Sequence, residues 1–143
     1  MNKKLLPFAL LFVSVSGMAG QASVTKVDTP NRIVLPGGTG LSVYTIGSRD
    51  MQGQTIAKID SIEWSTTGYP RSIGEAVELC FRTYGAGTRC VPIAPNSYGV
   101  SYDFNDESFY PGAGVNIRHT TTAGSARNSQ PSGQDTVRFN ISY

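Results

Sequence analysis

The chain has 143 residues, 39% of them hydrophobic, and its 12 basic and 10 acidic side chains give a formal net charge of +2. Lys3 and Lys4 account for this excess, so the remaining chain is balanced in charge and contains no run of like charge. Nothing in this balance indicates the concentrated basic surface that nucleic acids or anionic membranes require, so we expect neither a nucleic-acid partner nor attraction to a membrane surface. The length suits one domain with a substantial core.

The first 22 residues have the three parts of a secretory signal peptide. Two lysines precede the apolar run Leu5–Val15, and small residues follow it. This run is shorter than the roughly 20 apolar residues of a membrane-spanning helix. We expect cleavage after Ala22, with Ala19 as the second choice. Residues 1–22 are thus predicted to be a signal peptide, and residues 23–143 a single exported domain without a membrane span.

Beyond the signal, apolar residues recur with period two, which is typical of strands. Strand character occurs at residues 41–46, 56–64, 77–82, 98–104, 115–117 and 137–143. Turn signals rich in glycine and proline separate these runs. The sequence predicts an all-β fold: one small antiparallel β-sandwich or a barrel-like domain.

Three further expectations concern particular strands and loops. The apolar phase shifts within Ile56–Trp64, which predicts a β-bulge near residues 60 and 61. The alternating aromatic residues of the segment 98–104 are expected to face the core. Residues 23–40 and 120–135 lack strand character, and the second segment is expected to be a long mobile loop, either functional or merely tolerated.

The two cysteines, Cys80 and Cys90, flank a turn signal between two predicted strands. In an oxidising compartment such a pair usually forms a disulfide. Their spacing is not that of a C-x-x-C redox motif, and one histidine in the whole chain offers too few ligands for zinc. We therefore expect a structural disulfide across a hairpin.

Motifs of catalytic chemistry, such as G-x-S-x-G, H-E-x-x-H or a phosphate-binding loop, do not occur in the sequence. The single histidine, His119, follows a strand and is expected to be exposed, with a pH-sensitive contact as the alternative. The acidic segment 103–107 is typical of a solvated turn, because its spacing does not match a calcium-binding loop. The sequence predicts a protein that is not an enzyme and uses no cofactor and no metal.

Aromatic side chains in a turn region are candidates for a partner surface. Phe109 and Tyr110 precede Pro111 there, and we expect them to be partly exposed. Together with His119, they are the residues predicted to contact a protein partner.

Several segments resemble the FlhE family of periplasmic accessory proteins of the bacterial flagellum. They are Gly40–Tyr44, Ile56–Trp64, Val77–Cys80, Arg89–Val91 and Val137–Tyr143. The resemblance implies a non-enzymatic β protein of the periplasm, linked to swarming motility and to limiting proton leakage through the flagellar export apparatus. It also implies that the protein acts by binding a flagellar component, through loops or a sheet edge.

Two other classes of protein stay open, as does a location outside the cell. One is a fimbrial or surface structural subunit, because the alternating C-terminal strand suits strand complementation. The other is a small secreted inhibitor or ligand-binding β domain that uses loop aromatics as its contact surface. The sequence does not define an oligomeric state.

Overall fold

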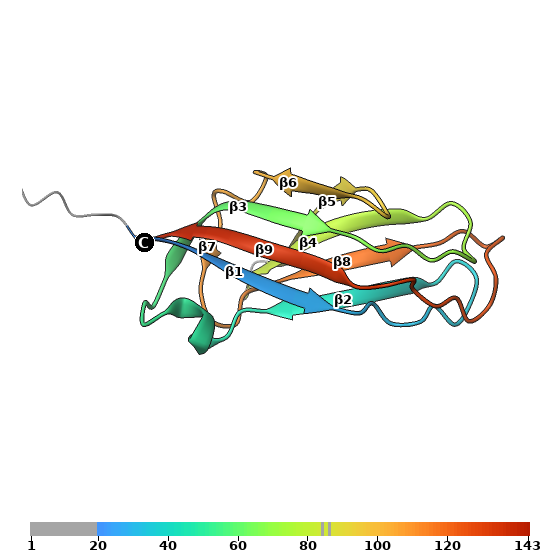
Figure 1. Cartoon of the computed structure of the whole chain (residues 1–143), viewed down its shortest axis with the longest axis horizontal. Helices are drawn as coiled ribbons and strands as arrows, with labels where there is room; N and C mark the ends of the chain where they lie inside the picture. The colour runs from blue at the N-terminus through green and yellow to red at the C-terminus, as the bar shows by residue number, and fades with distance from the viewer. Residues whose placement is uncertain (1–19, 84, 86) are drawn as a thin grey trace, which may run out of the picture.

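Two antiparallel sheets packed face to face form the described part of this computed structural model, which covers residues 20–83, 85 and 87–143. Nearly all of the predicted signal peptide therefore lies outside the described residues. The first sheet has the strand order β1-β9-β3-β6, with β7 also paired to β3, and the second has the order β2-β8-β4-β5 (Figure 1). The predicted β-sandwich is thus confirmed.

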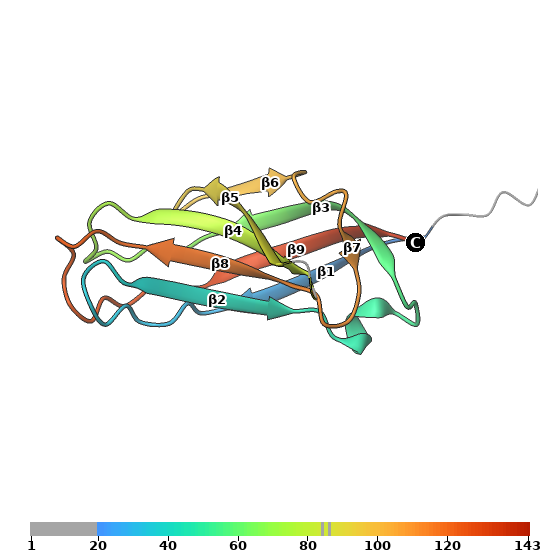
Figure 2. The same ribbon diagram turned by 180° about the vertical axis from the view of Figure 1, so that it is seen from behind.

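The strands are β1 (Gln21–Asp28), β2 (Thr39–Thr45), β3 (Ala57–Ser65), β4 (Ala76–Thr83), β5 (Gly87–Ile93), β6 (Tyr98–Ser101), β7 (Ser108–Phe109), β8 (Gly114–Thr120) and β9 (Asp135–Ser142). One short 3-10 helix, η1 (Ser48–Met51), follows β2. Within the described residues, no helix has the length and apolar character needed to cross a membrane. Figure 2 shows the second sheet from its own side, with β2, β8 and β4 in the foreground.

The core lies between the two sheets, because every second residue of the central strands points inward. The fully buried side chains of these strands include Ile59, Ile62, Leu79, Phe81, Ile117 and Phe139. Two aromatic pairs strengthen the packing: Phe81 stacks on Phe104, and Phe109 meets Phe139 edge to face. The period-two pattern of the sequence therefore reports the interior correctly along β3, β4, β8 and β9.

The predicted bulge in β3 is confirmed. The register between β3 and β9 shifts between Ile59 and Ser61, so that Asp60 is the additional residue. This shift lets both Ile59 and Ile62 point into the core, although they are three positions apart.

The predicted hairpin disulfide is also confirmed. Cys80 of β4 lies directly opposite Cys90 of β5, and the two are bonded. Because Leu79 and Phe81 point into the core, the disulfide lies on the outer face of the second sheet.

The expectation that residues 23–40 lack strand structure is wrong for their first part. β1 pairs along its whole length with β9 and forms one edge of the first sheet. Only Val24 of this strand is buried, so the apolar pattern of an edge strand is too weak to identify it. The strand begins at Gln21, upstream of the preferred cleavage position after Ala22.

The expected orientation of the segment 98–104 is likewise wrong. Only Phe104 reaches the core, whereas Tyr98, Val100 and Tyr102 are exposed and the inward position is taken by Ser101. Period-two alternation shows that two faces differ, but it does not say which face is covered.

Candidate functional site

Three loops meet at the end of the sandwich opposite the C-terminus (Figure 1). They comprise residues 29–38, 66–75 and 121–134, and we call them the loop platform. Backbone hydrogen bonds tie the third loop to the other two: Asn128 donates to the carbonyl of Val34 at 3.1 Å, and Thr122 to that of Ile73 at 3.0 Å. The predicted loop between β8 and β9 is therefore present and is packed against both of its neighbours, whereas its mobility stays a prediction.

A buried cluster of three ionisable side chains lies beneath the platform. The His119 ring is fully buried between two carboxylates, with Nδ1 at 2.7 Å from Glu75 Oε1 and Nε2 at 2.8 Å from Asp135 Oδ2. Asp135 is also fully buried, and the side chain of Glu75 is nearly so. We call these three residues the histidine cluster.

The carboxylates of the cluster also hold the polypeptide around them. Asp135 accepts hydrogen bonds from the Ser42 hydroxyl at 2.6 Å and from the Thr67 amide at 2.8 Å. Glu75 accepts one from the Tyr69 amide at 3.1 Å. Buried carboxylates need such partners to offset the loss of hydration. The cluster therefore fixes the second loop of the platform from below.

Tyr69 extends the same network to the first loop. Its ring meets His119 edge to face with 5.3 Å between centroids, and its hydroxyl donates to the carbonyl of Asn31 at 2.7 Å. Burial, together with the charges of Asp135 and Glu75, raises the pKa of Tyr69 above its usual range. The hydroxyl thus remains a donor at neutral pH, and the first two loops are joined through it.

The charge of His119 follows from its two partners. Burial alone lowers the pKa of an imidazole, but the hydrogen bonds to Asp135 and Glu75 and the charges of these carboxylates outweigh it, and the pKa of His119 rises to about 9. Both ring nitrogens then carry a proton at neutral pH and both donate. The cluster is an imidazolium held between two carboxylates.

This geometry differs from that of a nucleophilic triad. The Ser42 hydroxyl donates to Asp135 and not to the ring of His119, so no hydroxyl is bonded to a free imidazole nitrogen. Ser42, His119 and Asp135 are all fully buried, out of reach of a substrate. The chemistry that the arrangement supports is the positioning of the loops.

The outer surface of the platform combines apolar and basic side chains. Its exposed large apolar residues are Val34, Leu35 and Ile73, and its exposed cationic residues are Arg32, Arg71 and Arg127. The only acidic residue in the three loops is Glu75, which faces His119. Each loop supplies one arginine, so the platform presents a positive, partly apolar surface to solvent.

The structure separates the residues predicted to contact a partner. Phe109 is buried in β7 beside the start of β3, at the opposite end of the sandwich from His119, and Tyr110 is half-buried. The expectations that Phe109 is partly exposed and that His119 is an exposed residue at a strand end are therefore wrong. Phe109 packs against Phe139, and the carboxylates of the cluster enclose His119.

One signal for the histidine cluster was present in the sequence. Val115, Ile117 and His119 share one face of β8, and the first two are core residues, so the alternation places His119 inward. A buried histidine in turn calls for polar partners. Glu75 and Asp135 lie 44 and 16 positions away, and no local motif points to them.

The acidic turn after β6 has a partner of its own. Arg89 of β5 donates to both carboxylate oxygens of Asp106 and to the carbonyl of Asp103, and its guanidinium lies over the ring of Phe104. These contacts link β5 to the turn and engage the Asp106 carboxylate.

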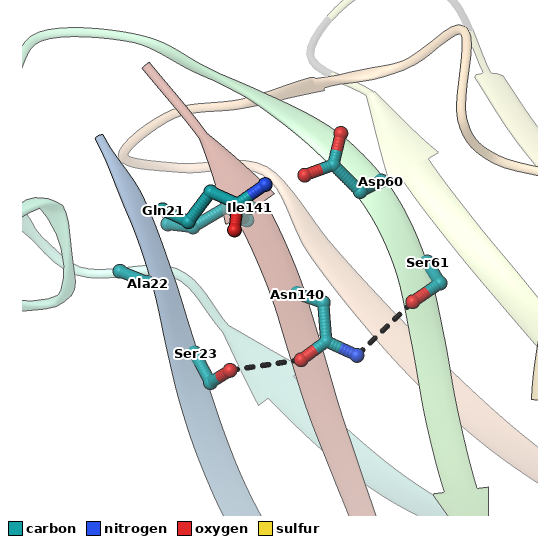
Figure 3. Close-up of a pocket in the computed structure, with 7 residues that line it drawn as sticks. All are labelled: Gln21, Ala22, Ser23, Asp60, Ser61, Asn140 and Ile141. Carbon is teal, nitrogen blue, oxygen red and sulfur yellow. Dashed lines mark hydrogen bonds between the residues drawn. The ribbon is translucent and has the colours of Figure 1, made fainter. Parts of the chain in front are cut away.

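A shallow polar hollow lies on the outer face of the first sheet, beside the start of β1 and the end of β9 (Figure 3). At its centre, Asn140 of β9 accepts a hydrogen bond from Ser23 of β1 and donates to Ser61 and Glu63 of β3. The amide is thus satisfied within the sheet, and these groups join the three strands across their outer face.

The fold and the site define a disulfide-linked β-sandwich domain whose loop end is held by a buried ion cluster. No protein-family model matches the chain, and neither does any curated protein sequence. Among solved structures, it is similar to the crystal structure of FlhE, with a TM-score of 0.65 and 15% sequence identity. The likeness covers 87% of this chain and 100% of that one, and at this identity it shows a shared fold.

Proposed function

We propose that this protein is a non-enzymatic periplasmic accessory protein of the bacterial flagellum and that it acts by binding a protein partner. The observation that carries the proposal is the fold shared with the whole of the FlhE chain. The segments that resemble the FlhE family in sequence, from Gly40 to Tyr143, support it. On this proposal the protein promotes swarming and limits proton leakage through the flagellar export apparatus.

A periplasmic location agrees with the disulfide between Cys80 and Cys90, because such bonds persist in oxidising compartments. Export would require removal of the N-terminal signal. Cleavage after Ala22 would remove two residues of β1, whereas cleavage after Ala19 would leave the strand whole. The Gly20 carbonyl also accepts a hydrogen bond from the Tyr143 amide at 2.9 Å.

We therefore expect the exported protein to begin at Gly20. N-terminal sequencing of protein purified from a periplasmic extract measures this directly. A start at Ser23 would contradict the expectation, and an uncut chain would contradict the signal peptide itself.

The loop platform is the surface that we assign to the partner. Its three arginines and its exposed Val34, Leu35 and Ile73 are complementary to a flagellar protein segment that carries acidic and apolar side chains. The histidine cluster holds the loops in place before binding, which lowers the entropic cost of association.

The test is genetic complementation in a strain from which the gene has been deleted. The platform variant Arg32→Ala/Arg71→Ala/Arg127→Ala is compared with a control of equal charge change. The control, Arg49→Ala/Arg118→Ala/Arg138→Ala, alters three exposed arginines outside the platform. We expect wild type and control to restore swarming and suppress proton leakage, and the platform variant to do neither.

Two results would count against the proposal in different ways. Normal swarming and no proton leakage in the deletion strain would remove the flagellar role. Full complementation by the platform variant, at wild-type protein levels, would show that the partner binds elsewhere.

A further inference from the structure

β6 is an edge strand: one side of its backbone pairs with β3, and the other side faces away from the sheet. Among the described strands it pairs only with β3. The carbonyl of Ser97 accepts a hydrogen bond from the Thr66 amide, so the backbone of Ser97 is directed toward the β3 side. Because these directions alternate along a strand, the backbone N–H and C=O groups of Tyr98 and Val100 point toward the open edge.

The side chains of this edge lack the usual protection against strand pairing. Tyr98, Val100 and Tyr102 are 84%, 48% and 66% exposed. No charged residue occurs from position 93 to position 102. Edge strands of soluble proteins are normally guarded by charges, prolines or bulges. Pro95, the only proline between positions 93 and 102, precedes β6 and does not block its edge, so the edge is available for pairing.

The strand is also held in a fixed position for such pairing. Gly99 lies opposite Trp64 of β3, and a Cβ atom at Gly99 would lie 2.6 Å from the indole ring. The absence of a side chain thus lets Trp64 pack directly on the β6 backbone. The strand needs no ordering when a second strand arrives, which favours association.

The pattern of exposed side chains is symmetric about Val100. In an antiparallel pair of two β6 strands centred on this residue, Val100 faces Val100 of the second copy, and Tyr98 faces Tyr102 of the second copy. Such aromatic cross-strand pairs stabilise sheets. The carboxylates of Asp103 and Asp106 would approach the uncharged segment 93–97, so like charges do not meet.

We propose that β6 pairs with β6 of a second copy of this chain, in an antiparallel two-fold arrangement that joins the two first sheets into one continuous sheet. The symmetric pattern favours a second copy, because a strand from another protein would impose no such symmetry. The inference does not depend on the flagellar role. Two paired β6 strands, of four residues each, would bury less surface than the roughly 1,200–2,000 Å² typical of stable complexes. The dimer therefore forms in a concentration-dependent manner.

Oxidative cross-linking tests the register. Val100→Cys places two thiols opposite one another at a Cα separation of about 5.5 Å in a hydrogen-bonded pair, within the range of a disulfide. The matched control is Val27→Cys, because Val27 is 53% exposed and lies on the opposite edge of the same sheet. We expect covalent dimers of Val100→Cys to form at least about tenfold faster, because pairing raises the effective thiol concentration.

Sedimentation equilibrium of the exported domain, from micromolar to millimolar concentration, tests the association itself. Wild type and Val27→Lys should show a monomer–dimer equilibrium. Val100→Lys should remain monomeric with an unchanged melting temperature, because it places two like charges opposite one another. A wild type that stays monomeric throughout, or cross-linking of Val100→Cys no faster than that of Val27→Cys, would overturn the proposal. Dimers that Val100→Lys leaves intact would also overturn it.

Discussion

The loop platform and β6 both expose apolar side chains, but different interactions hold them in place. Val34 and Ile73 lie on loops that have no continuous strand ladder and are fixed from below by the histidine cluster. Val100 lies on a strand that β3 fixes along one edge. Loops require side-chain anchors because their backbone hydrogen bonds are scattered, whereas a strand is anchored by its ladder and keeps its other edge free.

This difference has an energetic consequence. The three members of the histidine cluster compensate one another, so the loss of one member leaves buried charge without a partner. The contacts of an edge strand are separate and individually small. Single substitutions should therefore cost much more beneath the platform than along β6.

The largest effect is expected for His119→Ala. The substitution leaves Glu75 and Asp135 without the imidazolium between them, and removal of one partner of a buried ion pair costs about 3–5 kcal/mol. Urea unfolding of the purified domain measures the change. The adjacent Arg118→Ala is the control: its ion pair with Glu78 is on the surface, and its loss should cost about 0–1 kcal/mol. Equal losses in the two variants would contradict a stabilising cluster.

The next effect is a pH dependence. The pKa of His119 rises to about 9 in the folded state, against an ordinary value of 6.5, so the folded state binds the proton more tightly. The resulting stabilisation is complete below pH 6.5 and is lost as the pH rises through 9. The shift corresponds to about 3 kcal/mol.

Unfolding free energies measured from pH 6 to pH 10, in wild type and in His119→Gln, isolate this contribution. The wild type should lose stability across the window relative to the variant. If the difference between them stayed constant, the assigned charge state of His119 would be wrong.

The disulfide should contribute somewhat less to the stability of the domain. Reduction of Cys80–Cys90 releases a closed loop and should lower the unfolding free energy by roughly 2–3 kcal/mol in the chain-entropy model. Thermal unfolding with and without dithiothreitol measures it. The variant Cys80→Ser/Cys90→Ser should match the reduced wild type and ignore the reductant, and a wild type that also ignores it would contradict the expectation.

The smallest effects are expected for alanine substitutions of one glycine in each region, Gly99 in β6 and Gly124 in the loop platform. Gly99→Ala forces a methyl group against the Trp64 ring and should cost about 1–2 kcal/mol by overpacking. Gly124→Ala, in the platform, meets only Ile73 at 3.9 Å and should be neutral or slightly stabilising. The fluorescence of Trp64, the only tryptophan, should change only in the first variant. A neutral Gly99→Ala would show that Trp64 does not pack on β6.

The residues that could be predicted from the sequence are those with local signals. Period-two alternation put Leu79 and Phe81 on one face of a strand, the phase shift in β3 marked the bulge, and a turn between Cys80 and Cys90 indicated the disulfide. Each of these features depends on neighbours within about ten residues, so pattern and turn chemistry suffice.

The candidate site could not be predicted in the same way, because tertiary structure assembles it. Glu75 and Asp135 meet His119 only after β4 and β9 have joined opposite sheets. The arginines of the platform come from three separate loops. The balance of charges counted along the sequence therefore does not show that they lie together in the folded protein. The one local clue to the burial of His119 was its alternation with the apolar residues Val115 and Ile117 along β8.

A direct measurement of the pKa of His119 tests whether an imidazolium fixes the platform. The chain contains a single histidine, so its imidazole resonances can be followed by NMR without overlap from another ring. The structure predicts a pKa of about 9 and protons on both ring nitrogens at pH 7. A pKa at or below the ordinary value of 6.5, or a neutral ring at pH 7, would contradict the account.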